Sequence, residues 1–287
     1  MTRWLQQWEA IHIHTEFITW CEWNTSVHID QDAGETSDSD TERDRGREPS
    51  AASISPDHDG YYIAKKPPFP GLPPAEIERL YNITGFIPAL TSFIRTHCDQ
   101  PQIFLTPRDR FDCFKQVNIV LPAQPWVASS PLPTKTIVHA TPSRPSNNPR
   151  SPAMQSAWFD AAFVLEDPAT DAFPNPPVRI ACIRVIFQLP PHLAFAPHPL
   201  AFVEWYTHLG PIDPTTQMHH VSRATRNRLP HSAVICVTQI LRGCHLIPHF
   251  PRNMSCEWTR ENSLDMATRF YVNTYVDLST FVASKHI

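Results

Sequence analysis

The stretch VRIACIRVIFQL, residues 178–189, has the alternating apolar pattern of a β-strand, but the pattern changes face halfway along. The apolar residues are Val178, Ile180 and Cys182 in the first half and Ile183, Val185 and Phe187 in the second. Side chains of a strand alternate between its two faces, so this change requires an extra residue in the strand. We therefore predict a strand bent through a β-bulge or through the corner of a barrel.

Further segments of strand character are bounded by prolines and polar turns. They are residues 111–121, 136–140, 158–165, 200–207, 218–222 and 233–240. The chain has 31 prolines against 7 glycines, and the prolines interrupt the long helices that would connect parallel strands. The sequence therefore predicts an antiparallel sheet rolled into a small barrel, with an SH3-like barrel as the first choice and an open sandwich as the second.

Helical periodicity is confined to short segments. Residues 73–80 begin with prolines and an acidic first turn, and residues 86–97 carry an apolar stripe. Residues 61–105 are therefore predicted to form a helical hairpin. A C-terminal helix is predicted within residues 261–287, with its inward side chains at Leu264, Ala267, Phe270 and Tyr271. The predicted fold class is mainly β with flanking helices (α+β).

The first 60 residues differ from the rest in composition. Trp4, Leu5 and Trp8 recur at helical spacing, so a short helix is predicted within residues 1–29. The segment DQDAGETSDSDTERDRGRE, residues 30–48, has almost no apolar side chain, and residues 30–60 are predicted to be a disordered acidic linker.

The predicted β-barrel-like domain extends over residues 106–260. It contains a loop rich in proline and serine at residues 122–156.

Charge and cysteine content indicate where the chain resides. A net charge of −4 gives no general attraction to nucleic acid or to an anionic membrane. A local basic patch could still attract such a partner. The seven cysteines are odd in number and never spaced as a CxxC pair, which is typical of reduced thiols. Neither a signal peptide nor a spanning apolar segment is recognisable. We expect an intracellular protein, nuclear or cytoplasmic, without membrane association.

The sequence contains no motif that carries a known chemistry. The scarcity of glycine removes nucleophile elbows and phosphate-cradling loops. Cys244, His245, His249 and Cys256 are the best metal candidates, but their spacing fits no zinc pattern, so they are interpreted as packing and surface residues. We therefore predict no enzymatic activity, no cofactor, no metal and no small-molecule substrate.

The candidate binding residues lie in one part of the chain. Arg223, Arg226 and Arg228 concentrate positive charge in a connection between strands, which is suited to phosphates or to a solvated turn. Trp205 and Tyr206 lie on opposite faces of a strand, so at most one is expected in the core, and the other could line a recognition surface beside the arginines.

Several segments of the chain resemble those of a fungal protein family. They are residues 62–65, 86–90, 110–115, 178–187, 198–206, 221–223 and 244–248. They are similar to the C-terminal segment of uncharacterised basidiomycete proteins related to Plavaka-like and Kyakuja-Dileera-Zisupton-type DNA transposons. The order of the strands also resembles bromo-adjacent-homology (BAH) domains. The resemblance implies a detached or degenerate part of a transposon-encoded protein, since the chain has no room for a ribonuclease-H-like core.

Four hypotheses about function follow. The first is a transposon-derived, non-enzymatic module that binds a protein or chromatin partner. The second is a nucleic-acid-binding accessory of a transposition complex that holds DNA phosphates with Arg223, Arg226 and Arg228. The third is a metal-dependent enzyme or a zinc-stabilised domain that uses Cys244, His245, His249 and Cys256. The fourth is a transposon remnant without a function.

Overall fold

The computed structural model describes residues 60–98, 105–121, 134–145, 154–166, 177–250 and 262–275. The chain divides into two units, Met1–Pro56 and Asp57–Ile287, and every described residue belongs to the second. The predicted N-terminal helix and nearly all of the predicted acidic linker therefore lie outside the described residues.

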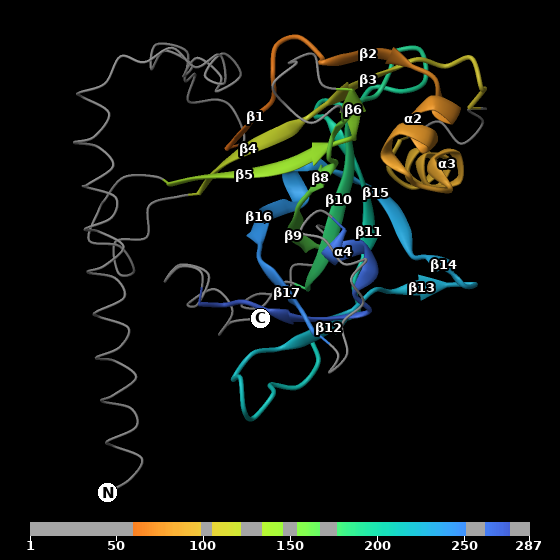
Figure 1. The fold of residues 1–287 in the computed structure, drawn as a ribbon. Helices are drawn as coiled ribbons and strands as arrows, with labels where there is room; N and C mark the ends of the chain where they lie inside the picture. Colours follow the sequence, from red (N-terminus) through yellow and green to blue (C-terminus); the bar gives the residue numbers. More distant parts are fainter. Residues whose placement is uncertain are drawn as a thin grey trace, which may run out of the picture. The chain divides into compact units, whose positions relative to one another are not determined.

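Strand β10 (Val178–Gln188) is the central strand of the larger sheet (Figure 1). One edge pairs with β9 (Ala161–Leu165) and then with β3 (Phe111–Phe114), while β11 (Leu200–Trp205) pairs with the other edge. The register to β11 shifts between Ile183 and Val185. This bulge confirms the change of face that the sequence predicts, and Arg184 is the extra residue.

The larger sheet has seven antiparallel strands, and a second sheet has four. The larger sheet is completed by β2 (Phe69–Leu72), β15 (Ser232–Cys236) and β16 (Ile240–Cys244). The second sheet consists of β1 (Tyr61–Tyr62), β4 (Gln116–Leu121), β5 (Thr134–Thr141) and β8 (Trp158–Phe159). Strand β5 lies inside the predicted loop 122–156 and is longer than the short strand expected there.

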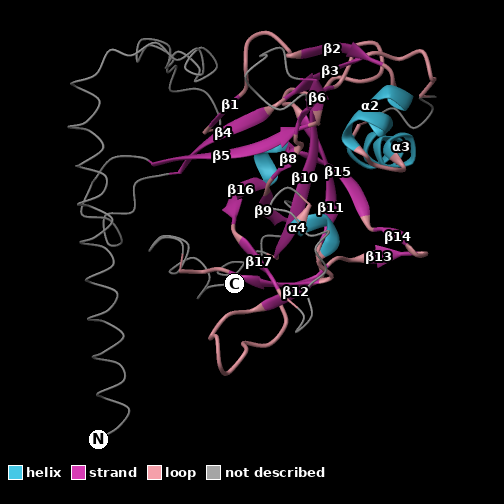
Figure 2. Cartoon of the chain, viewed as in Figure 1, coloured by secondary structure: helices cyan, strands magenta, loops and turns pink. Residues whose placement is uncertain are grey.

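Three smaller β structures complete the described strands (Figure 2). A three-stranded sheet consists of β12 (His220–Ser222), β18 (Arg269–Val272) and β17 (Leu246–Pro248). The two ribbons are β13 (Thr225–Arg226) with β14 (Leu229–Pro230), and β6 (Arg144–Pro145) with β7 (Met154–Gln155).

Helices α2 (Pro74–Tyr81) and α3 (Phe86–His97) lie close to the predicted positions. A proline in the first turn favours the start of α2, and Asn82 in the left-handed conformation ends it. The buried stripe of α3 packs against the larger sheet. The arrangement of these helices as a helical hairpin remains a prediction. A short 3₁₀ turn is found at Val237–Gln239.

The predicted C-terminal helix is wrong over most of its described length. Helix α4 covers only Ser263–Met266, and the chain then becomes strand β18. Strand β18 pairs with β12 and β17. Its alternate residues Phe270 and Val272 are buried in the core. Aromatic and β-branched residues suit such a half-buried strand, so tertiary pairing prevails over the helical spacing.

The core lies on both faces of the larger sheet. On one face, Phe187 and Phe202 pack with Phe86 of α3, at centroid distances of 5.1 and 6.0 Å from its ring. On the other face, Ile183 and Val203 pack against Val138 and other residues of the second sheet. A third cluster joins the first half of β10 to the three-stranded sheet.

The expected mainly β class with a few helices is confirmed, but the described strands do not close into a barrel. Residues of both sheets contribute to one shared core, and the open sandwich given as the second choice remains a prediction. An SH3-like or BAH-like barrel is therefore not confirmed.

Candidate interaction site at the arginine hairpin

The β13–β14 ribbon is a tight hairpin that presents arginine. Arg226 opposes Leu229, and the two residues between them, Asn227 and Arg228, have φ angles of 54° and 65°. Two consecutive left-handed residues are the requirement of a type I′ turn, whose twist matches that of the flanking strands. Arg226, Arg228 and Leu229 are all exposed, and Leu229 retains 58% of its accessible surface.

The base of the hairpin is fixed to the end of β11 by main-chain hydrogen bonds. The amide of Ala224 donates to the carbonyl of Trp205 at 2.9 Å, and the amide of Trp205 donates to the carbonyl of His231 at 2.8 Å. The amide of His231 donates in turn to the carbonyl of Ala224. The hairpin is therefore a directed extension of the larger sheet.

Arg223 does not join the other two arginines. Its guanidinium donates to the carbonyl of Leu264 at 2.6 Å and to Asp265 Oδ1 at 2.8 Å. Burial alone would lower the pKa of Arg223, but the hydrogen bond to Asp265 raises it above its ordinary value. Arg223 is thus a structural anchor at the base of the hairpin, while Arg226 and Arg228 are solvent-exposed.

The prediction that only one of Trp205 and Tyr206 is in the core is wrong, because both are buried. Trp205 enters the core between the two sheets, where the guanidinium of Arg179 lies 5.3 Å from the centre of its ring. Tyr206 packs edge-to-face on Phe270 at 5.4 Å. The larger sheet is covered on both faces, so neighbouring residues of β11 can both be core residues.

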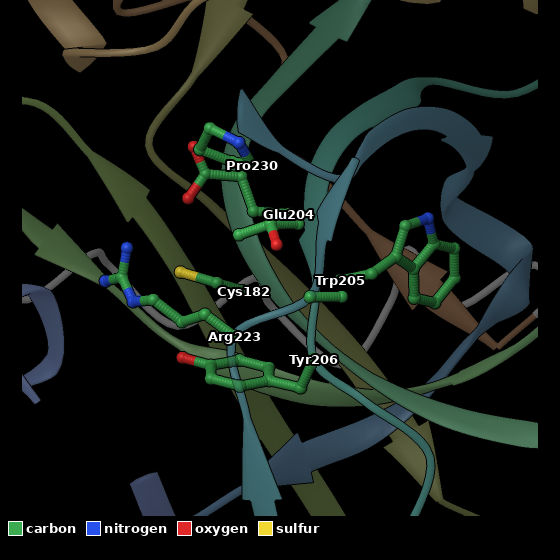
Figure 3. Close-up of a pocket in the computed structure, with 8 residues that line it drawn as sticks. Cys182, Glu204, Trp205, Tyr206, Arg223 and Pro230 are labelled. Carbon is green, nitrogen blue, oxygen red and sulfur yellow. The ribbon is translucent and has the colours of Figure 1, made fainter. Parts of the chain in front are cut away.

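A small cavity of about 50 Å³ lies at the foot of the hairpin. It is lined by Cys182, Glu204, Trp205, Tyr206, Arg223, Ala224, Thr225 and Pro230. Figure 3 shows Cys182, Tyr206 and Arg223 on one side of the strand and the indole of Trp205 pointing away. The volume suffices for a few water molecules.

The polar atoms around this cavity are only partly satisfied within the described residues. Of the lining residues, Tyr206 Oη and Arg223 Nε are buried without a hydrogen-bond partner, and so is Nε of Arg184, which lies outside the lining. Glu204 Oε2 lies 3.9 Å from Arg184 Nε, which is an ion-pair distance and too long for a hydrogen bond. Water in the cavity would satisfy such atoms.

The thiol of Cys182 and the phenol of Tyr206, which both line the cavity, keep their protons at neutral pH. Burial raises the pKa of Cys182 to about 11 and raises the pKa of Tyr206 well above its ordinary value. Nucleophilic attack requires a thiolate or phenolate, which neither residue forms near pH 7. The arrangement is suited to hydrogen bonding and to support of the hairpin.

Arg184 is the structural residue that the sequence interpretation missed. Its guanidinium donates to the carbonyls of Tyr81 and Asn82, both at 3.2 Å, and lies 3.3 Å from Asp265. It also stacks over the ring of Phe159 at 4.3 Å. A lone arginine at the point where the apolar pattern changes face is the signal that would have indicated it.

The metal candidates do not converge within the described part of the chain. No group of three metal-ligating side chains is found there. Burial raises the pKa of the Cys244 thiol, and His245 Nδ1 lies 3.1 Å from the side-chain amide of Asn273. Cys256 lies outside the described residues.

Comparison of the chain with protein-family models, with curated proteins and with solved structures gave no match. None of the helices in the described ranges is long and apolar enough to cross a lipid bilayer.

Proposed function

We propose that this chain is a non-enzymatic interaction module, of transposon origin as its sequence resemblance implies, which binds an acidic protein segment through the β13–β14 hairpin. The observation that carries the proposal is the joint exposure of Arg226, Arg228 and Leu229 on a tight type I′ hairpin. Arginine is enriched among the residues that contribute most to protein interfaces.

The hairpin has the properties of a preformed binding element. Its base is held by the hydrogen bonds to Trp205 and by the anchor of Arg223 on Asp265. A partner would therefore not have to order this segment on binding, which reduces the entropic cost of association. Two guanidinium groups match carboxylates in charge and in geometry.

An acidic protein is a better ligand for this hairpin than a nucleic acid backbone. The nucleic-acid hypothesis uses three arginines, but Arg223 is paired with Asp265 and only two remain. Affinity for phosphate backbones rises with the number of phosphates neutralised, so two contacts support only weak binding. The exposed Leu229, which follows Arg228 and opposes Arg226, adds an apolar contact that a phosphate backbone cannot use.

The proposal is tested by selecting peptides from a random library on the purified full chain. We expect the selected peptides to be enriched in Asp and Glu next to an apolar residue. Peptides without acidic enrichment, or peptides that bind equally well when Arg226 and Arg228 are both changed to Ala, would refute the hairpin as the site.

A further inference from the structure

The second sheet has an outer face that the hairpin proposal does not use. Val117, Ile119, Val138 and Ala140 point inward to the core, so the intervening residues of β4 and β5 face outward. Together with Tyr62 of β1 and Trp158 of β8, which lie opposite Asn118 and Thr141, the outward set is Tyr62, Gln116, Asn118, Val120, Lys135, Ile137, His139, Thr141 and Trp158. Figure 1 shows β4 and β5 side by side at the edge of the domain.

Trp158 is held in a fixed orientation on this face. Its ring stacks on His139 with a centroid distance of 4.1 Å and an interplanar angle of 19°. The indole Nε1–H donates to Asp160 Oδ1 at 2.8 Å, while Asp160 Oδ2 lies 2.7 Å from His139 Nδ1 and accepts from the His139 amide. Since Trp158 is 57% exposed, the ring face away from His139 is accessible.

The four strands of this face carry a positive charge at Lys135. None of the four strands contains an acidic residue, and both oxygens of the neighbouring Asp160 accept hydrogen bonds from Trp158 and His139. Lys135 is exposed within β5, and Lys65 and Lys66 are exposed shortly after β1. Lys135 is thus the charged side chain that the strands themselves offer to a phosphate, in a chain whose net charge is −4.

We infer that this outer face binds single-stranded nucleic acid, with an unpaired base stacked on Trp158. The exposed lysines contact phosphates, and the side-chain amides of Gln116 and Asn118 can hydrogen-bond to base edges. A duplex keeps its bases stacked and unavailable to the indole. Four-stranded sheets in other single-strand binders stack about two or three bases in this way.

This inference is independent of the proposed function, because the hairpin belongs to other strands and recognises a different ligand. The fixed indole is the decisive feature. A tryptophan whose role was only to fill the core would be buried, and an exposed, oriented aromatic ring is typical of a stacking platform.

The inference is tested with the full chain and a fluorescein-labelled oligothymidylate of about ten nucleotides, measured by fluorescence anisotropy. An abasic strand of the same length keeps the phosphates but lacks the bases, and a duplex of the same length masks them. We expect the oligothymidylate to bind at least about tenfold more tightly than either, because each stacked base contributes to the affinity.

Variants identify the residues. Trp158→Ala should weaken oligothymidylate binding about tenfold, whereas Trp158→Phe should retain most of it. Phe195→Ala is the matched control, because Phe195 is exposed but lies in the loop between β10 and β11. Lys135→Ala should reduce the slope of log affinity against log salt concentration by about 0.7.

Three results would overturn the inference. They are equal binding of the abasic strand and the oligothymidylate, undiminished binding by a folded Trp158→Ala variant, and absence of oligothymidylate binding at low salt. The last result would leave an apolar peptide as the occupant of this face. The abasic comparison uses the unmodified protein and holds even if a variant fails to fold.

Discussion

Arg184 connects three parts of the domain from a single position in β10. Its guanidinium reaches the end of α2, the side chain of Asp265 and the ring of Phe159, and only 3% of the residue is exposed. Removal of such a side chain leaves buried carbonyls without donors and leaves an unfilled space.

We predict that Arg184→Ala lowers the free energy of unfolding by about 3 kcal/mol, because it removes the donors of the Tyr81 and Asn82 carbonyls and leaves a cavity. Arg184→Lys should recover only part of it, because one ammonium group cannot reach both carbonyls and Asp265. Urea denaturation measures the change, and Arg95→Ala on the exposed side of α3 is the control. A loss below about 1 kcal/mol would show that the contacts of Arg184 do not stabilise the domain.

The Cys182 thiol provides a prediction on pH. Burial raises the pKa of this thiol from its ordinary value near 9 to about 11, so the folded state keeps the proton after the unfolded state has lost it. The protonated Cys182 thiol makes its full contribution to the free energy of unfolding below pH 9, and this contribution is lost as the pH rises to about 11. Cys182→Ala should therefore reduce the fall in stability over this range by roughly 2 kcal/mol, measured by urea denaturation at several pH values. Identical pH profiles for variant and parent would contradict it.

At the level of single residues, the sequence predicted the bulge of β10 but not the burial of Trp205 and Tyr206. The bulge is recorded in the local alternation of Cys182 and Ile183. The burial depends on cores covering both faces of β11, and these are formed by α3, the second sheet and β18, which are distant in sequence. Local patterns do not contain this information.

At the level of elements, the turn of the β13–β14 hairpin carries a charged side chain at a position whose backbone conformation favours glycine. Arg228 occupies the second position of the type I′ turn with φ of 65°, where glycine is strongly preferred. The side chain at this position costs conformational energy. The presence of arginine at such a position fits a functional use of its charge.

We predict that Arg228→Gly stabilises the protein by about 0.5–1 kcal/mol and at the same time weakens the binding of acidic peptides. Thermal unfolding and peptide titration measure the two effects on the same variant. Asn227→Val is the opposite control, since a β-branched residue is poorly tolerated at positive φ. A stabilised Arg228→Gly variant with unchanged peptide affinity would argue against the hairpin as a binding element.

Other elements show which patterns can be read locally. The helices at residues 74–81 and 86–97 follow from their capping and apolar stripes. The helical spacing of Leu264, Ala267 and Phe270 predicts a helix that includes residues 269–272. Residues 269–272 instead form a strand because they pair with β12 and β17. The sequence of the segment alone does not predict this pairing.

At the level of the whole molecule, the described domain presents two surfaces of different chemistry on separate sheets. The hairpin extends from the larger sheet beside β11, while the stacking face belongs to β1, β4, β5 and β8. The sequence indicated the arginines, but it could not indicate the stacking face, because Trp158, His139 and Asp160 become neighbours only through the pairing of β5 with β8.

We predict that the two surfaces act independently. The Trp158→Ala variant should bind acidic peptides with unchanged affinity, and the double variant of Arg226 and Arg228 should bind oligothymidylate with an affinity within about threefold of the parent, because distant sites contribute additively. Anisotropy titrations of both probes with both variants measure this. Loss of both activities in either variant would indicate one shared site or a folding defect.

The central claim is that the arginine hairpin recognises an acidic protein segment. The most direct test is the affinity of a labelled acidic peptide, taken from the selection, for the full chain and for two double variants. One is Arg226→Ala/Arg228→Ala. The other is the control Arg95→Ala/Arg108→Ala, which removes the same charge at exposed positions elsewhere. The account predicts at least about tenfold weaker binding by the hairpin variant alone. Equal weakening in both variants would show that the peptide responds only to net charge, and this would contradict the account.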